Sequence, residues 1–396
     1  MRLNKEAASL LALIATLTIA TRSVNYMVQS TVPPLARELG FAPSAIGTLA
    51  AVGAVGQLIG SSFVNIALGS KPRRRALMIS ASVIPLMLLT FWLSNGVLFW
   101  IAAFLSGLSF GVIMPNLINL ASMRPEYAER LLAAYTLSLS ISLVAGPAYE
   151  TAVLTRYGYR YVFLFFLPLA VLLALLSPKI PIIGARSTDI GATYKAALSS
   201  KGFLSAALAV TSYNVPFIAL TTYLPIYASE ELGFAKAAAY SLFLPFFATS
   251  MLTRLYMFLR PVRNLYKAFA ASVALTLLGL SIFYTARNYA LLAAAMAVLG
   301  VPHGSVFTLS TIMIVRTTPL EERNSVNSLF SSYLVILGMV VPPALGVAAE
   351  LWGYDAMWLI LTPSVTIISA IFFILFNKTK EFRNPTLSEA LSRGRL

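Results

Sequence analysis

The chain has 396 residues, of which 58% are hydrophobic and 11% charged. Soluble domains carry about a quarter charged residues, so this composition indicates a protein that lies in a membrane. The absence of cysteine excludes disulfides, thiolate metal sites and cysteine catalysis.

Apolar runs long enough to cross a bilayer recur along the whole chain. A hydrocarbon core takes about 20 helical residues, and continuous runs of this kind leave helices as the only spanning structure. The first run is longer than the apolar core of a signal peptide and shows no cleavage site, so we predict it to be a membrane helix. We predict twelve spans, at roughly 10–36, 45–69, 76–93, 97–122, 131–155, 159–177, 202–228, 237–259, 268–286, 289–315, 325–352 and 356–376.

Basic residues are distributed unevenly between the segments that connect the spans. If the N-terminus is cytoplasmic, the inner segments hold 22 Lys and Arg and the outer segments hold 5, as the positive-inside rule requires. Two inner segments, 69–75 and 260–267, are predicted basic turns at corresponding places. We expect a multi-pass protein of the cell (plasma) membrane with both termini cytoplasmic. The asymmetry also accounts for the net charge of +15, so we expect no nucleic-acid partner.

An internal repeat divides the chain into two halves. The residues Glu38 to Ala42 recur unchanged as Glu231 to Ala235, 193 positions later. Further matches keep this register or drift from it by two positions; they pair Gly107 with Gly300, Gly111 with Gly304, Arg130 with Arg323 and, at an offset of 195, Pro147 with Pro342. One duplicated module of about 190 residues therefore builds the protein. We predict an N-terminal six-helix bundle at 1–178, a cytoplasmic linker at 179–201, a C-terminal six-helix bundle at 202–377 and a cytoplasmic tail at 378–396.

Two six-helix repeats joined by a basic inner loop resemble the major facilitator superfamily. The family's loop pattern G-x-x-x-D-R-x-G-R-R is matched at Arg73 and Arg74, while its earlier positions are held by Asn65, Gly69, Ser70 and Pro72. The drug/proton antiporter pattern G-x-x-x-G-P-x-x-G-G is matched at Gly146 and Pro147, with Ser142, Glu150 and Thr151 at other positions. The resemblance implies an all-α membrane protein with twelve transmembrane helices in two pseudo-symmetric six-helix bundles.

The same resemblance implies where a substrate binds. In such transporters the two halves move against each other around a site near the membrane midplane. Helices 1, 4, 7 and 10 line that site in the family, so polar residues on these four helices are candidates. A basic residue, Arg22, and an acidic residue, Glu150, lie inside spans. Both are candidates, because charges in the hydrocarbon are costly and mark functional sites.

Arg22 lies twelve residues into the first span, about 18 Å deep at 1.5 Å per residue. Asn25, Tyr26 and Gln29 follow at positions that share its helical face. A guanidinium donates two parallel hydrogen bonds to carboxylate, phosphate or sulfonate groups, so we predict an anionic substrate. The alternative is a fixed structural pair between Arg22 and a neighbouring helix.

Glu150 is the only acid clearly inside a span, near the outer end of helix 5. The family fold places helices 1 and 5 side by side, so Glu150 is either a proton carrier or the counter-ion of Arg22. His303, the only histidine, lies in helix 10 and is a candidate for a proton relay or a ligand contact. A satisfied core histidine is the alternative.

Neutral polar residues complete the predicted substrate site. They are Asn116 and Asn119 on helix 4 and Tyr213 and Asn214 on helix 7. Asparagine in membrane helices also joins helices to one another, so both roles stay open. Arg254 lies close to the inner end of helix 8 and its side chain can reach the membrane surface; we assign it a structural role.

These observations favour a secondary active transporter of a small organic or inorganic anion, with protons as the coupling ion. The chain has no H-E-x-x-H pair and no G-x-x-x-x-G-K-[ST] phosphate loop, so we expect no enzyme, no metal, no cofactor and no ATP-driven step. A proton-coupled exporter of hydrophobic or cationic compounds is the alternative. We expect the protein to act as a monomer in the lipid bilayer.

Overall fold

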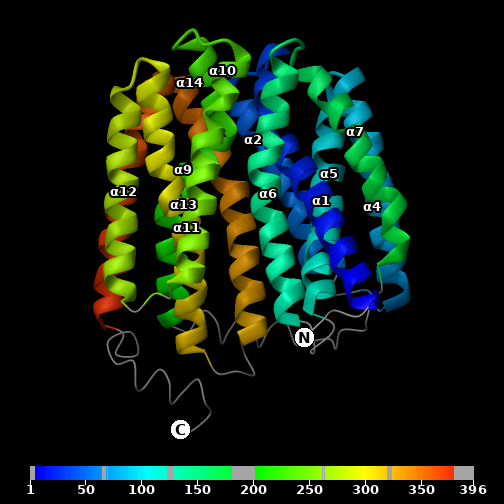
Figure 1. The fold of residues 1–396 in the computed structure, drawn as a ribbon. Helices are drawn as coiled ribbons and strands as arrows, with labels where there is room; N and C mark the ends of the chain where they lie inside the picture. The colour runs from blue at the N-terminus through cyan, green and yellow to red at the C-terminus, as the bar shows by residue number, and fades with distance from the viewer. Residues whose placement is uncertain are drawn as a thin grey trace, which may run out of the picture. The chain divides into compact units, whose positions relative to one another are not determined.

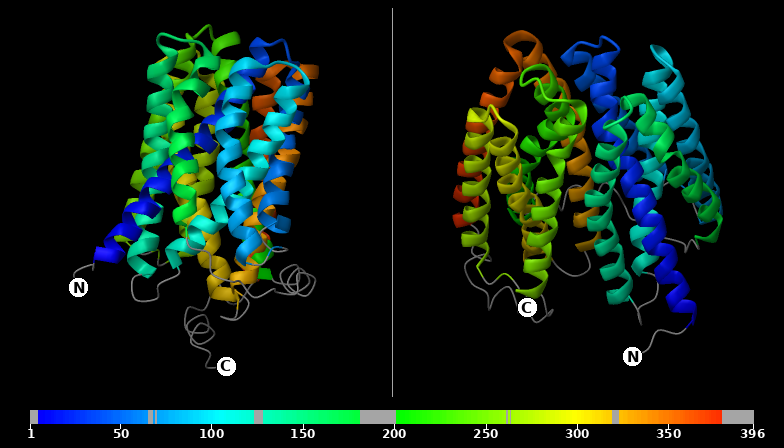
Figure 2. Two further views of the ribbon diagram at one scale, coloured as in Figure 1. Left: turned by 90° about the vertical axis from the view of Figure 1, so that its right-hand side faces the viewer. Right: turned by 45° about the horizontal axis from the view of Figure 1, so that its top comes forward.

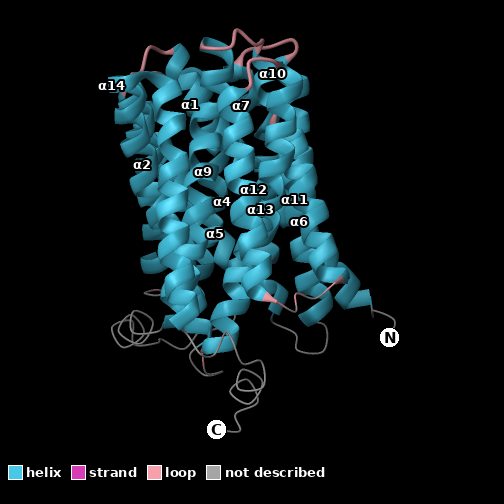
Figure 3. Ribbon diagram, turned by 90° about the vertical axis from the view of Figure 1, so that its left-hand side faces the viewer, coloured by secondary structure: helices cyan, strands magenta, loops and turns pink. Residues whose placement is uncertain are grey.

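The structure, a computed structural model, describes residues 5–64, 68, 70–122, 128–180, 201–260, 262, 264–318 and 323–378. Within these ranges the chain is almost entirely helical and contains no strand (Figure 3). In lipid each backbone N–H and C=O must be satisfied inside its own segment, which a helix does. The predicted all-α class is therefore confirmed.

Eleven helices of the described chain are long and apolar enough to cross a membrane. The first half contains α1 (Lys5–Glu38), α2 (Pro43–Leu58) with a π-helical continuation η1 (Ile59–Val64), α4 (Ser70–Leu93), α5 (Val97–Ser122), α6 (Ala128–Leu154), α7 (Tyr159–Leu176) and a short 3-10 turn η2 (Ser177–Lys179). The second half contains α9 (Lys201–Glu230), α10 (Lys236–Ser241), α11 (Phe243–Leu259), α12 (Leu265–Thr285), α13 (Tyr289–Thr317) and α14 (Arg323–Lys378) (Figure 1).

The last two predicted spans form the single element α14. Its 56 residues would measure about 84 Å as one straight helix, far more than a bilayer is thick. Gly353 has non-helical backbone angles (φ 81°, ψ 164°), and the chain reverses direction there, as the orange and red parts of the ribbon show (Figure 2). The positive φ is one that glycine adopts without steric cost. The twelve predicted passes therefore appear as eleven long helices, the last of them folded back.

One other predicted boundary is wrong. The segment 69–75 was expected to be a turn, but α4 begins at Ser70 and contains the basic residues that follow. Pro72 is tolerated because the first helical turn has no intrahelical partner for its N–H groups. The predicted span 237–259 is confirmed as the long apolar stretch Lys236–Leu259, although a turn at Leu242 divides it into α10 and α11. Pro245 cannot donate the hydrogen bond that would join these two helices.

By their contacts the residues divide into two compact units. Unit 1 contains 1–187, 221–241 and 338–347, and unit 2 contains 188–220, 242–337 and 348–396. Unit 1 thus includes the ends of α9 and α10 and a stretch of α14, all from the second half of the sequence. The predicted linker falls almost wholly on residues outside the described ranges, as does the tail. The predicted division at 178 and 202 stays a prediction.

Helices within each unit approach closely at glycines. In unit 1, a Cβ on Gly107 of α5 would lie 1.9 Å from the carbonyl oxygen of Gly53 on α2. In unit 2, a Cβ on Gly300 of α13 would lie 2.1 Å from the carbonyl oxygen of Phe246 on α11. Gly107 and Gly300 are repeat-equivalent, so both copies of the module bring the same pair of helices into backbone contact.

The duplicated pentapeptide forms the same turn twice. Gly40 follows α1 with φ 85° and Gly233 follows α9 with φ 70°. At the first turn the N–H of Phe41 donates to the carbonyl of Ala36 at 3.0 Å, the pattern of a helix end closed by a left-handed residue. The internal repeat read from the sequence therefore corresponds to a repeated structure.

Replacing Gly107 by alanine should destabilise the protein. The new methyl group would overlap the α2 backbone, and such overpacking costs about 1–3 kcal/mol. We expect a lower midpoint of thermal unfolding in detergent. Gly158→Ala is the matched control, since nothing lies within 4 Å of the position of its Cβ. Equal midpoints for the two variants would contradict the close contact.

Candidate functional site

Glu150 lies in a fully buried cluster of hydroxyl groups in unit 1. The hydroxyl of Thr31 on α1 donates to Glu150 Oε2 at 2.9 Å, and the Glu150 side chain has no solvent exposure. The hydroxyl of Tyr240 on α10 is hydrogen-bonded to Ser30 on α1 and lies 3.4 Å from Thr31 Oγ1. Three helices, α1, α6 and α10, therefore meet at one acid.

No cation of the described chain forms an ion pair with this acid. Glu150 Oε1 is buried without a hydrogen-bond partner among the described residues. Lys236, the only cation on α10, forms an ion pair with Glu38 and lies 5.3 Å from the centre of the Tyr159 ring. Arg22 is nine residues before Thr31, about 13 Å lower along α1, and no ion pair joins it to Glu150.

A second contact in unit 1 joins α2 to α9 and α14. The Tyr223 hydroxyl donates to the carbonyl of Pro342 at 2.7 Å and lies 3.3 Å from the carbonyl of Pro43. A Cβ on Gly47 would meet the Pro342 carbonyl oxygen at 2.2 Å, and one on Gly346 would meet that of Pro43 at 2.3 Å. The backbone of α2 therefore packs against the backbone of α14 here, with the Tyr223 hydroxyl between the two helices.

The helix ends above these contacts are joined by ion pairs. Arg37 donates to both carboxylate oxygens of Glu230, from Nε at 2.7 Å and from Nη2 at 3.0 Å. Arg37 and Glu230 are separated by 193 residues, so equivalent positions of the two repeats pair with each other. This ion pair lies at helix ends that the charge distribution predicts to be outside. We use the name outer seam for three sets of contacts together: the hydroxyl cluster around Glu150, the contacts of Tyr223 with Pro342 and Pro43, and the ion pair between Arg37 and Glu230.

The predicted polar face of α1 is only partly accessible. Arg22 is partly exposed, and its Nε is buried with no hydrogen-bond partner among the described residues. Asn25 and Tyr26 are buried, whereas Gln29 is exposed. Arg22 therefore has no structural partner in the described chain that would explain its position.

The candidates on α5 are less informative. Asn116 is buried and its amide donates to the carbonyl of Val112 in its own helix at 2.7 Å. The side chain of Asn119 lies outside the described part of the structure. Their predicted role as ligand contacts stays a prediction.

In unit 2 the structure brings His303 and Tyr213 together. The Ser250 hydroxyl is hydrogen-bonded to His303 Nδ1 at 2.8 Å, and the Tyr213 ring centre is 5.7 Å from that of the imidazole. The imidazole is enclosed by Phe217, Phe246 and Phe247 at centre distances of 4.5, 4.9 and 5.5 Å.

Polar groups in this aromatic cluster are only partly satisfied. The hydroxyl of Tyr213 is buried without a hydrogen-bond partner among the described residues. Arg254 interacts electrostatically with both Tyr213 and His303. Asn214, next along α9, is partly exposed. The histidine therefore lies among polar groups near a cation, and its predicted role as a proton relay or ligand contact stays a prediction.

Sequence reasoning missed Thr31, Tyr240 and Ser250. Tyr240 is 210 residues from Ser30, and no local pattern indicates such a pair. The repeat carries a weak signal, because Tyr240 occupies the position of Gly47 in the first copy. A large side chain in place of a glycine at a helix contact indicates that the two copies pack differently there.

The comparisons with known proteins agree with this architecture. The profile of the Major Facilitator Superfamily matches residues 12–262 and 264–394. The chain belongs to this family. It is therefore a multi-pass integral membrane transporter and not an enzyme. Among curated protein sequences, none matches the chain.

Solved structures of other family members resemble the whole chain. The nucleoside transporter NupG has 14% identity and a TM-score of 0.71, over 93% of this chain and 99% of that one. A POT family transporter in complex with 5-aminolevulinic acid has 12% identity and a TM-score of 0.75, over 93% and 96%. An inward-facing, occupied bacterial homolog of the human lysosomal transporter Spinster has 11% identity and a TM-score of 0.72, over 96% and 99%. At these identities the likeness shows the fold alone.

Replacing Tyr223 by phenylalanine should weaken the outer seam. The variant loses a buried hydrogen bond to the Pro342 carbonyl, which contributes about 1 kcal/mol. We expect a lower unfolding midpoint than for Tyr149→Phe, whose hydroxyl is exposed and has only a long contact of 3.4 Å to the Phe165 carbonyl. If Tyr149→Phe is destabilised as much, the Tyr223 bond does not hold the seam.

Proposed function

We propose that this transporter moves a small organic or inorganic anion by alternating access and that protons drive the movement. The observation that carries the anionic substrate is Arg22, a partly exposed residue within a membrane span whose Nε is buried without a hydrogen-bond partner and which pairs with no acid of the described chain. Keeping an uncompensated charge in the hydrocarbon costs at least about 2.5 kcal/mol. A substrate oxyanion that binds there offsets the cost with charge-assisted hydrogen bonds.

The arrangement of charges favours this proposal over the exporter of hydrophobic or cationic compounds. A cation site needs an acid that the substrate can reach. Glu150 is fully buried behind the hydroxyls of Thr31 and Tyr240, whereas Arg22 is partly exposed. The carboxyl group is therefore enclosed, whereas a cation site would need it to be accessible.

Transport by Arg22 variants tests the anionic substrate. In proteoliposomes given a panel of carboxylates, phosphates and sulfonates, Arg22→Gln should lower uptake of the accepted anion about 10- to 100-fold, since a hydrogen bond to a charged group contributes about 1.5–3 kcal/mol. Arg22→Lys should keep part of the activity, because it retains the charge but loses the planar fork.

Arg156→Gln is the matched control, since Arg156 is exposed beyond the end of α6 and the same charge is removed. Full anion uptake by Arg22→Gln would contradict the proposal. Uptake of a cationic dye that survives in Arg22→Gln and is lost in Glu150→Gln would favour the exporter.

The comparison of the two repeats supports proton coupling through Glu150. With the offset of 195, the position of Glu150 is occupied by Leu345 in the second copy, so the helix contact can be made without an acid. The closed outer seam offers Glu150 hydroxyl groups and no cation of the described chain. A carboxylate there would be buried and unpaired, which is strongly unfavourable, so the closed seam suits the neutral acid. Loss of the proton would then favour opening.

Glu150→Gln should uncouple transport from the proton gradient. Glutamine keeps the shape and the hydrogen bonds of the neutral acid but cannot release a proton. We expect the variant to exchange anion across the membrane with no dependence on pH, and to lose accumulation against a gradient.

The control is Glu350→Gln, which removes an exposed acid and should leave gradient-driven uptake unchanged. Gradient-driven accumulation by Glu150→Gln at the wild-type level would remove Glu150 from the coupling step and leave His303 as the remaining candidate.

We also propose that the protein acts as a monomer in the cell membrane with both termini in the cytoplasm. The distribution of 22 Lys and Arg on the inner segments against 5 on the outer segments supports the placement of the termini.

A further inference from the structure

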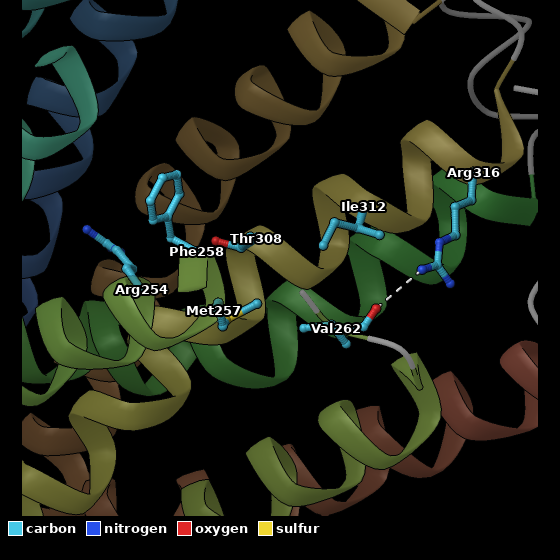
Figure 4. Close-up of a pocket in the computed structure, with 7 residues that line it drawn as sticks. All are labelled: Arg254, Met257, Phe258, Val262, Thr308, Ile312 and Arg316. Carbon is cyan, nitrogen blue, oxygen red and sulfur yellow. Dashed lines mark hydrogen bonds between the residues drawn. The ribbon is translucent and has the colours of Figure 1, made fainter. Parts of the chain in front are cut away.

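Unit 2 contains a basic groove between α11 and α13 that adjoins the aromatic cluster around His303, with Arg254 close to both. The two helices touch where a Cβ on Gly304 would meet the Ser250 carbonyl oxygen at 2.4 Å. Beyond this contact the glycines end, and a cavity of about 410 Å³ opens between the helices (Figure 4). Its lining comes from Arg254, Met257 and Phe258 of α11 and from Thr308, Ile312 and Arg316 of α13.

The lining of this basic groove is apolar in the middle and cationic at both ends. Thr308, Ile312 and Arg316 are spaced by four residues and share one face of α13. Arg254 and Arg316 lie at opposite ends of the lining (Figure 4), and Arg254 is near the level of Thr308. Eight residues separate Thr308 from Arg316, about 12 Å along the helix. At the Arg316 end, Nη2 donates to the Val262 carbonyl at 3.5 Å.

Arg254 is not required by the architecture of the repeat. Arg254 occupies the position of Ser61 in the first copy, and the first copy makes the same glycine contact without a cation there. Neither α11 nor α13 contains an aspartate or glutamate. The groove therefore concentrates positive charge at the membrane face where both helices end.

Exposed apolar side chains flank the basic groove. Leu255, Phe258 and Leu259 on the same part of α11 are 51%, 78% and 65% exposed, as is typical of side chains that contact acyl chains. Basic pockets between membrane helices near the membrane surface bind anionic lipid headgroups. A cation at each end with apolar side chains between them suits a headgroup with two separated phosphates.

We propose that the basic groove binds the headgroup of a phospholipid that carries two phosphates. Arg316 at the mouth and Arg254 at the deep end each bind one phosphate, and the linking part of the lipid lies over Met257 and Ile312. This assignment gives Arg254 a ligand in place of the structural role that its position in the span suggested. It does not depend on which substrate is transported or on proton coupling.

Lipid binding to the purified full-length protein tests the proposal. Native mass spectrometry would count lipids retained from mixtures of diphosphatidylglycerol, phosphatidylglycerol and phosphatidylcholine. The wild type should prefer the lipid with two phosphates, then the lipid with one, then the zwitterionic lipid. Arg254→Gln and Arg316→Gln should each weaken binding of diphosphatidylglycerol about fivefold, as expected for the loss of one cation near the membrane surface.

Arg260→Gln is the matched control, because Arg260 is an exposed arginine just beyond α11 that does not line the basic groove. It should retain wild-type binding, and Arg254→Lys and Arg316→Lys should retain most of it. Equal binding of the three lipids by the wild type, which requires no variant to fold, would overturn the proposal. Displacement of the lipid by an equal concentration of soluble glycerol bisphosphate would overturn the lipid assignment, because the acyl chains would then contribute nothing.

Discussion

The close approach of helix backbones at glycine is the constraint on which the rest of the structure depends. In lipid no hydrophobic force draws helices together, so they associate where small residues allow wide van der Waals contact. The contacts at Gly107 and Gly300 are repeat-equivalent and join α2 to α5 and α11 to α13. Where such glycines end, the helices separate. The basic groove beyond Gly304 begins at this point, so the same spacing of small residues sets both the packing and the place of the cavity.

Charge placement follows from the cost of burying an unpaired ion. At the exposed ends of α1 and α9, Arg37 and Glu230 pair with each other. Within the spans the groups are kept apart: Glu150 is surrounded by hydroxyls, and Arg22 has no acid from the described chain beside it. This separation leaves neither of them in a permanent ion pair, as the proposed exchange of a proton at Glu150 and of an anion at Arg22 requires. A permanent pair between them would have satisfied both and left no site.

Most of the fold could be predicted from the sequence, because the length of an apolar run fixes a membrane helix and an internal repeat fixes the pairing of elements. The breaks inside helices were harder. Pro245 stops α10 from continuing into α11, whereas Pro72 is accommodated inside α4, and the difference depends on distance from a helix end. The site was predicted only in part. His303 and Tyr213 were named and do lie together, but the partners of Glu150 were not found, because Tyr240 is far away in the chain and neutral.

The outer seam shows how duplication produced two unlike contacts from one module. Gly47 and Tyr240 are equivalent positions, and so are Ser30 and Tyr223. Around Pro342, the tyrosine comes from α9 and the glycine from α2; around Glu150, the tyrosine comes from α10 and the small residue from α1. Each contact therefore holds one tyrosine and one small residue, with the roles exchanged between the copies. The two contacts therefore contain side chains of similar total size. A leucine, which the second copy has at Leu345, would fill the position of Glu150 equally well. Packing at this position therefore does not require an acid, and this is the observation behind the proposed protonation of Glu150 in the closed seam.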